Sequence, residues 1–201
     1  ILIRLADAPP LIITANRLSI GAGVMVALAT GARLRAPVYT RSLAHLTRKD
    51  IFLLGTASIS LALHFAFWTA SLDHTSVTSS TVLVTANPLL VVLASRLLLG
   101  EVIHPKVLVG IAVGLAGGLV LAAGDAGREG QLQGDILATL GAISIVGYLL
   151  AGRRLRTHVP VLQYTALVYS GTAILLVAAA MVAGEPFTGY TAGTYVAMLL
   201  L

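Results

Sequence analysis

Five polar side chains recur at helical spacing in the apolar segment 50–72: Thr56, Ser60, His64, Trp68 and Ser71. Residues three or four positions apart share one face of a helix, and the opposite face here carries Leu, Ala and Phe. Histidine is the side chain whose ordinary charge change falls near neutral pH, so His64 is a candidate proton carrier, with a structural hydrogen-bonding role as the alternative. Trp68 is expected either to stack on a bound solute or to belong to the interfacial aromatic belt.

Arg17 lies two turns inside another apolar segment, TANRLSIGAG. An arginine in the middle of a membrane helix costs about 2.5–3.5 kcal/mol on insertion scales, so its side chain must face protein or water. Two interpretations remain open. The guanidinium either snorkels toward the outer headgroups, or it lines a cavity and attracts a carboxylate or another anionic group.

The segment 75–101 begins with hydroxyl residues, continues as an apolar run and contains Asn87-Pro88 near its middle. Pro88 has no N–H, so the carbonyl of Val84 loses its helical partner and the helix is expected to kink. In lipid such a carbonyl must face protein or a water-filled cavity. Asn87 brings two donors and an acceptor to this kink, either to line the cavity or to bond a neighbouring helix.

Two further segments contribute residues to the predicted site and its packing. Gly110, Gly114 and Gly118 repeat every four residues, a small-residue face that favours close helix packing. Tyr148 shares a face with Gly141 and Ser144 and is expected to reach the cavity. Pro88 is the predicted hinge.

These residues need membrane-spanning helices to position them. The chain is 57% hydrophobic and 10% charged, which is typical of a polytopic all-α membrane protein. The absence of Cys excludes disulfides and thiolate metal sites, and we expect no metal or cofactor. Six full spans are predicted, with a partial helix before Asp7 and another from about Tyr190: 10–30, 50–72, 76–99, 105–123, 135–155 and 160–183. We expect the sequence to be a fragment of a longer protein.

The loops predict the orientation. Ten of the thirteen Lys and Arg residues lie in the loops after the first, third and fifth full spans or at the helix ends that border these loops. That side is therefore expected to be cytoplasmic, together with the N-terminus. The basic residues lie in short loops between spans, which argues against nucleic-acid binding.

A weak internal repeat relates the segment around Pro10 to the segment around Pro160, and the helix that precedes Pro160 is the fifth along the chain after the helix that precedes Pro10. An odd number reverses orientation, so the pattern indicates inverted halves. The order of features along the chain resembles the EamA-type branch of the drug/metabolite transporter superfamily. Besides this repeat, the features that carry the resemblance are Arg17, Asn87-Pro88, the Leu-Gly-Glu at 99–101, and Gly134-Asp135, where the next span begins. The resemblance implies two inverted five-helix repeats, of which 1–124 holds most of the first and 134–201 begins the second.

The resemblance also implies a central cavity and alternating access. We therefore expect a multi-pass transporter of the cytoplasmic membrane, an exporter of small amino-acid-like or amphipathic metabolites, monomeric, with protons as a candidate coupling ion. Arg17, His64, Trp68, Asn87 and Tyr148 would line the substrate path. A non-transporting scaffold or sensor is the alternative. An intramembrane enzyme is disfavoured, because no membrane-embedded carboxylate accompanies His64 and no catalytic residue is predicted.

Overall fold

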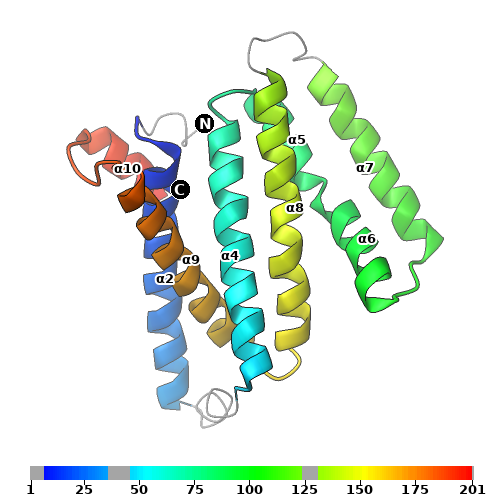
Figure 1. The fold of residues 1–201 in the computed structure, drawn as a ribbon, viewed down its shortest axis with the longest axis horizontal. Helices are drawn as coiled ribbons and strands as arrows, with labels where there is room; N and C mark the ends of the chain where they lie inside the picture. Colours follow the sequence, from blue (N-terminus) through cyan, green and yellow to red (C-terminus); the bar gives the residue numbers. More distant parts are fainter. Residues whose placement is uncertain (1–6, 36–45, 124–130, 201) are drawn as a thin grey trace. The chain divides into compact units, whose positions relative to one another are not determined.

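The computed structural model describes residues 7–35, 46–123 and 131–200, and these residues form helices joined by short connections (Figure 1). The predicted partial helix before Asp7 lies outside the described residues. In chain order the helices are α2 (Pro10–Arg35), α4 (Arg48–Ser71), α5 (Val77–Thr85), α6 (Asn87–Leu99), α7 (Pro105–Ala123), α8 (Gln131–Leu155), α9 (Val161–Val182) and α10 (Ala192–Leu200).

Five of the described helical segments are long and apolar enough to cross a membrane, counting α5 and α6 together, and α7 holds a shorter apolar stretch. Large apolar side chains point outward on these helices; Val113, Val120 and Ile174 are 67%, 74% and 69% exposed. A surface of this kind is stable in lipid rather than in water, because the bilayer covers it. The protein is therefore an all-α polytopic membrane protein, as the composition predicts.

Two compact units make up the fold, and α4 and α8 run through both. Unit 1 comprises the residues up to 62 and those from 147 onward, and unit 2 comprises 63–146.

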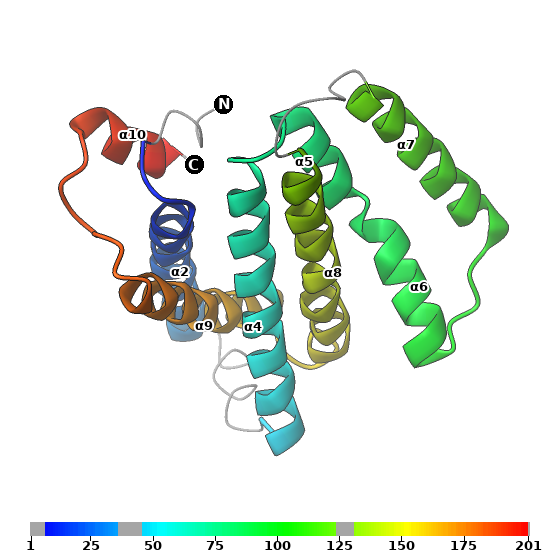
Figure 2. The same ribbon diagram turned by 45° about the horizontal axis from the view of Figure 1, so that its top comes forward.

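In unit 1, α2 and α9 lie against each other along their length (Figures 1 and 2). Ile12, near the start of α2, packs with Ala180, near the end of α9, whereas Gly21 further along α2 faces the ring of Tyr169. The two helices are therefore antiparallel. They are the helices that follow Pro10 and Pro160, and the inverted repeat that the sequence suggests for these segments stays a prediction.

In unit 2, α5 and α6 form one span that is interrupted at Ala86, and α7 packs mainly against α5. Ala86 ends α5 in a helical conformation and precedes α6 without a side-chain cap, and Pro88 occupies the first turn of α6. Pro88 accounts for this interruption, because a proline is tolerated in the first turn of a helix, where its missing N–H would be unpaired, but not in a helix interior.

Local chemistry explains where several helices begin and end. Thr47 and Asp50 form a reciprocal capping box, in which the Thr47 N–H donates to Asp50 Oδ2 (2.9 Å) and the Asp50 N–H donates to Thr47 Oγ1 (3.2 Å). Gly100 ends α6 in the left-handed region, φ 67°, which glycine adopts without strain. Thr191 accepts from the Thr194 N–H, so α10 begins at Ala192 rather than at the expected Tyr190.

Helix α8 begins at Gln131, four residues before the predicted start at Asp135. Gly134 does not open this helix but lies in its first turn. A Cβ at Gly134 would come within 2.7 Å of the Thr75 backbone nitrogen. The missing side chain therefore lets α8 pass close to the turn that precedes α5.

Candidate substrate path

The polar stripe predicted on α4 lies against glycines of α8. In unit 2, a Cβ at Gly141 would lie 3.3 Å from both the His64 carbonyl oxygen and the Trp68 backbone nitrogen. In unit 1, Gly147 occupies the corresponding place beside Ser60 and Thr56. Small residues of this kind let two helix backbones approach closely. The stripe is therefore turned away from lipid, as its spacing predicts.

His64 is 5% exposed, and its Nδ1 lies 2.9 Å from the Gly141 carbonyl oxygen. A carbonyl oxygen accepts only, so Nδ1 must carry the hydrogen. Its ring stacks on Trp68, with centroids 6.0 Å apart and an interplanar angle of 24°. The hydrogen bond to α8 thus fixes the imidazole, and the imidazole in turn limits the positions that Trp68 can adopt.

The indole nitrogen of Trp68 is buried, and no described residue accepts a hydrogen bond from it. A buried donor without a partner carries a desolvation cost, which an acceptor on a bound molecule would relieve. Ser79, 1% exposed on α5 of the same unit, likewise has an Oγ with no partner among the described residues. Ser79 was not singled out from the sequence, where it is one of several hydroxyls in a row.

Hydroxyls and one carboxylate join the end of α4, the turn before α5 and the first turns of α5 and α8 in unit 2. Ser71 Oγ lies 2.6 Å from Ser80 Oγ, which connects the end of α4 to α5. Thr75 donates from Oγ1 to Asp135 Oδ1 at 2.9 Å and so connects the same turn to α8. Sequence inspection did not pair these residues, because Thr75 and Asp135 are separated by sixty positions.

The interruption between α5 and α6 opens onto a cavity of about 430 Å³. Thr85, Ala86 and Pro88 line it from one side, and α7 lines the other side with residues that include Gly110, Gly114 and Gly118. A Cβ would meet nothing within 4 Å at Gly110 or Gly114, but at Gly118 it would come 2.6 Å from Val82 Cγ1. Two of the three glycines therefore widen the cavity, and the third brings α7 against α5.

Arg17 and Tyr148 belong to unit 1, whereas His64, Trp68 and Asn87 belong to unit 2. Arg17 is half-buried on α2, one turn before the Gly21 that faces Tyr169. Tyr148 is half-buried on α8 and stacks on Tyr164 at 5.9 Å, while the Tyr164 hydroxyl donates to the Tyr148 carbonyl at 3.0 Å. A Cβ at Gly152 would meet that hydroxyl at 2.8 Å, so this glycine makes room for it.

Asn87 is half-buried at the first position of α6, directly after the interruption. None of the five residues expected in the substrate path lines the 430 Å³ cavity, nor do they line a cavity between the start of α4 and the end of α8 or one between α2 and α9. Their role in binding stays a prediction.

The described residues contain no group of three His, Asp or Glu side chains arranged to hold a metal ion. The features that are present are an interrupted membrane span, a cavity beside it, and buried polar groups held by helix-to-helix hydrogen bonds. Discontinuous spans and polar groups at membrane depth are the usual parts of a solute transporter.

Residues 1–123 match the EamA-like transporter family, and the chain belongs to that family. A crystal structure of a protein that is 25% identical in sequence superposes with a TM-score of 0.69; the match covers 97% of this chain and 66% of the other. The chain thus spans slightly less than two thirds of that protein's length. No curated protein matches the sequence. The family assignment favours a transporter over an enzyme.

Proposed function

We propose that this protein is a secondary transporter that exports a small amino-acid-like or amphipathic metabolite across the cytoplasmic membrane by alternating access. The observation that carries the proposal is the interruption of the α5–α6 span at Ala86 beside a cavity of about 430 Å³. Interrupted spans provide backbone groups and flexibility at the depth where transporters bind their solutes. Membership of a transporter family supports the same conclusion.

Within this proposal, Trp68 offers its indole N–H and ring face to the solute, and His64 holds the ring in place. Asn87 offers an amide at the start of α6, and Tyr148 presents an aromatic face from α8. Arg17 would attract a carboxylate, since a guanidinium forms paired hydrogen bonds with one. The N-terminus and the arginine-rich loops would lie in the cytoplasm. The protein would act as a monomer.

The experiment is transport by the full-length protein in liposomes, with a pool of labelled amino acids and related metabolites, with and without a pH gradient. We expect accumulation of a carboxylate-bearing solute by the wild type and its loss in Arg17→Ala. If Arg17→Ala transported every solute as well as the wild type, Arg17 would be a snorkelling residue. If the wild type moved nothing in the pool, the amino-acid-like substrate class would be wrong.

Trp68→Phe separates the two contributions of the indole, because it keeps an aromatic ring and removes the N–H. We expect its KM to rise about three- to tenfold with little change in the maximal rate, which corresponds to the loss of one hydrogen bond. Phe67→Leu, at the adjacent position of α4, is the control. An unchanged KM in Trp68→Phe would remove Trp68 from the binding site.

The pH gradient tests His64. If accumulation depends on the gradient in the wild type and not in His64→Gln, the imidazole carries the coupling proton. If the gradient has no effect on the wild type, the protein is a facilitator or an exchanger, and His64 is structural. A scaffold or sensor would be indicated if Arg17→Ala and Asn87→Ala left the cellular phenotype intact while substitutions at helix contacts abolished it.

A further inference from the structure

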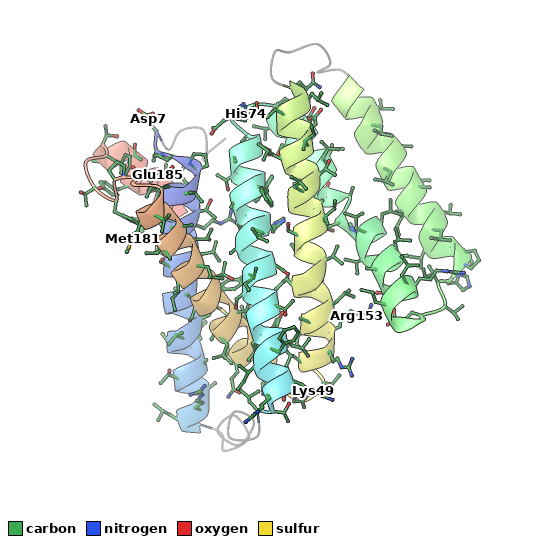
Figure 3. The ribbon with its side chains drawn as sticks, in the orientation of Figure 1. Asp7, Lys49, His74, Arg153, Met181 and Glu185 are labelled. Carbon is green, nitrogen blue, oxygen red and sulfur yellow. The ribbon has the colours of Figure 1, made fainter. Side chains whose placement is uncertain are left out.

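A separate cavity, of about 820 Å³, lies in unit 1 where α4 begins and α8 ends. Its lining combines two kinds of side chain. Arg48, Lys49, Arg154 and His158 supply basic groups, and Phe52 and Leu53 supply an apolar wall. Figure 3 shows Lys49 at the first turn of α4 and Arg153, the neighbour of Arg154, in the last turn of α8.

Asp50, the single carboxylate in the lining, already has its hydrogen-bond partners. Its Oδ2 accepts from the N–H and the hydroxyl of Thr47, both at 2.9 Å, and its Oδ1 lies 3.2 Å from His158 Nε2. The hydrogen bond between His158 Nε2 and Asp50 Oδ1 joins residues 108 positions apart. It fastens the α8–α9 turn to the start of α4 and thereby holds the two sides of the cavity together.

Arg48, Lys49 and Arg154 are exposed, and none of them forms an ion pair with a described residue. The cavity is therefore lined by three cations and by one carboxylate whose oxygens already accept hydrogen bonds, a balance that favours a positive potential in the cavity. The N-terminus of α4 adds to it, since the first turn of a helix favours negative charge. A cavity with this balance binds an anionic group.

The apolar part of the lining restricts which kind of molecule with an anionic group can bind in this cavity. Phe52 lies four residues after Arg48, which is about 6 Å further along the helix axis toward the membrane interior, and its side chain is 73% exposed. A free hydrophilic anion gains nothing from this wall. A phospholipid has both parts in the required order, with a phosphate at the helix end and an acyl chain beginning one turn deeper.

We propose that this cavity binds an anionic phospholipid, with Arg48 and Arg154 on the phosphate and Phe52 against the first part of an acyl chain. The cavity lies on the side of the membrane that carries most of the basic residues, where anionic headgroups attract such clusters. Acidic residues gather at the opposite end of unit 1: Asp7 precedes α2, and Glu185 follows α9 (Figure 3). The lipid would hold the start of α4 to the end of α8 at the membrane surface.

The Kd for dioleoyl phosphatidylglycerol can be measured by native mass spectrometry, in which the detergent-solubilised full-length protein is titrated with this lipid. Each Lys or Arg near an anionic lipid surface contributes about fivefold to binding. The double substitution Arg48→Gln with Arg154→Gln should therefore weaken phosphatidylglycerol binding about thirtyfold. Both side chains are exposed, so the melting temperature should stay at the wild-type value.

The matched control is Arg96→Gln with Lys106→Gln, which removes the same charge from the same predicted side of the membrane and does not touch the cavity lining. It should change the Kd less than twofold. An equal loss in this control would mean that net charge rather than the cavity binds the lipid, and would overturn the proposal. An unchanged Kd in the double substitution at Arg48 and Arg154 would overturn it as well.

Two competitors identify the ligand. Dioleoyl phosphatidylcholine has the same chains and a phosphate but no net charge, and it should bind at least tenfold more weakly. Inorganic phosphate at millimolar concentration should not displace the lipid. Equal binding of phosphatidylcholine, or displacement by inorganic phosphate, would contradict an anionic lipid as the ligand. Phe52→Asn should weaken phosphatidylglycerol binding several-fold, and an unchanged affinity would remove the acyl-chain contact.

Discussion

The imidazole of His64 donates from Nδ1 to the carbonyl oxygen of Gly141, 2.9 Å away. The two residues belong to α4 and α8 and are 77 positions apart in the sequence. The bond requires α4 and α8 to approach closely, and Gly141 permits this because it has no side chain. A Cβ there would lie 3.3 Å from two backbone atoms of α4. The position of the Trp68 ring, stacked on His64, therefore depends on a glycine in another helix.

Gly141→Leu should separate α4 from α8 and break the His64 hydrogen bond. Overpacking of a tight contact costs about 1–3 kcal/mol, so we expect a lower melting temperature in detergent together with a raised KM for the solute. Gly55→Leu is the control, because Gly55 is an exposed residue of α4 where an added Cβ would meet nothing within 4 Å. If Gly55→Leu were equally destabilising, helix propensity and not the α4–α8 contact would explain the effect.

The hydrogen bond between Thr75 Oγ1 and Asp135 Oδ1 should contribute to the stability of unit 2. Thr75 is 4% exposed, and hydrogen bonds to charged groups are stronger than neutral ones. In a double-mutant cycle with Thr75→Val and Asp135→Ala, we expect a coupling energy of about 1–2 kcal/mol. Thermal unfolding of the four proteins measures it.

Thr85→Val provides the reference for this cycle, since among the described residues the Thr85 hydroxyl bonds only to carbonyls of its own helix. That substitution should change stability by less than about 0.5 kcal/mol. A Thr75–Asp135 coupling of zero would mean that solvent replaces the bond without cost.

Features that depend on residues close in sequence could be predicted. The repeat of His64 and Trp68 with their polar neighbours is visible in one helix, and it correctly predicts a face turned away from lipid. Pro88 predicts the interruption at Ala86 because the loss of an N–H acts within one turn. Thr47 and Asp50 also form a local pattern, a capping box, that was present in the sequence and not recognised.

Features that depend on which helices meet could not be predicted. No local pattern connects Asp50 to His158, Thr75 to Asp135 or Ser58 to Thr172, whose hydroxyl donates to the Ser58 carbonyl at 3.1 Å. Each contact depends on tertiary packing between distant segments. The glycine repeat of α7 shows the same limit: the period identifies one face, but only the fold distinguishes the glycine that contacts α5 from the two that border a cavity.

Those glycines allow packing and binding to be tested separately. Gly114→Leu should fill part of the 430 Å³ cavity and reduce transport while the melting temperature changes little, because a Cβ there meets no atom within 4 Å. Gly118→Leu should instead lower stability by about 1–3 kcal/mol, because its side chain would collide with Val82.

Gly117→Leu is the control for both, since Gly117 neither lines the cavity nor approaches another side chain. It should leave both transport and stability near the wild-type values. If Gly114→Leu transported normally, solute would not pass through this cavity, and the scaffold alternative would gain support if Gly118→Leu alone altered the phenotype.

Pro88→Ala tests whether the interruption at Ala86 matters for transport. Alanine restores an N–H that can donate to the carbonyl of Val84, so α5 and α6 should join into a straighter helix. Since the substitution adds a hydrogen bond and removes a steric clash, the melting temperature should stay the same or rise. The maximal transport rate should fall several-fold, because a continuous helix can no longer bend where the cavity opens.

Pro105→Ala is the matched control for this substitution. Pro105 is the first residue of α7, where the N–H has no helical partner in any case. Its replacement should affect neither the melting temperature nor the transport rate. Normal transport by Pro88→Ala, with stability unchanged or raised, would show that the kink is a packing feature and that the conformational change takes place elsewhere.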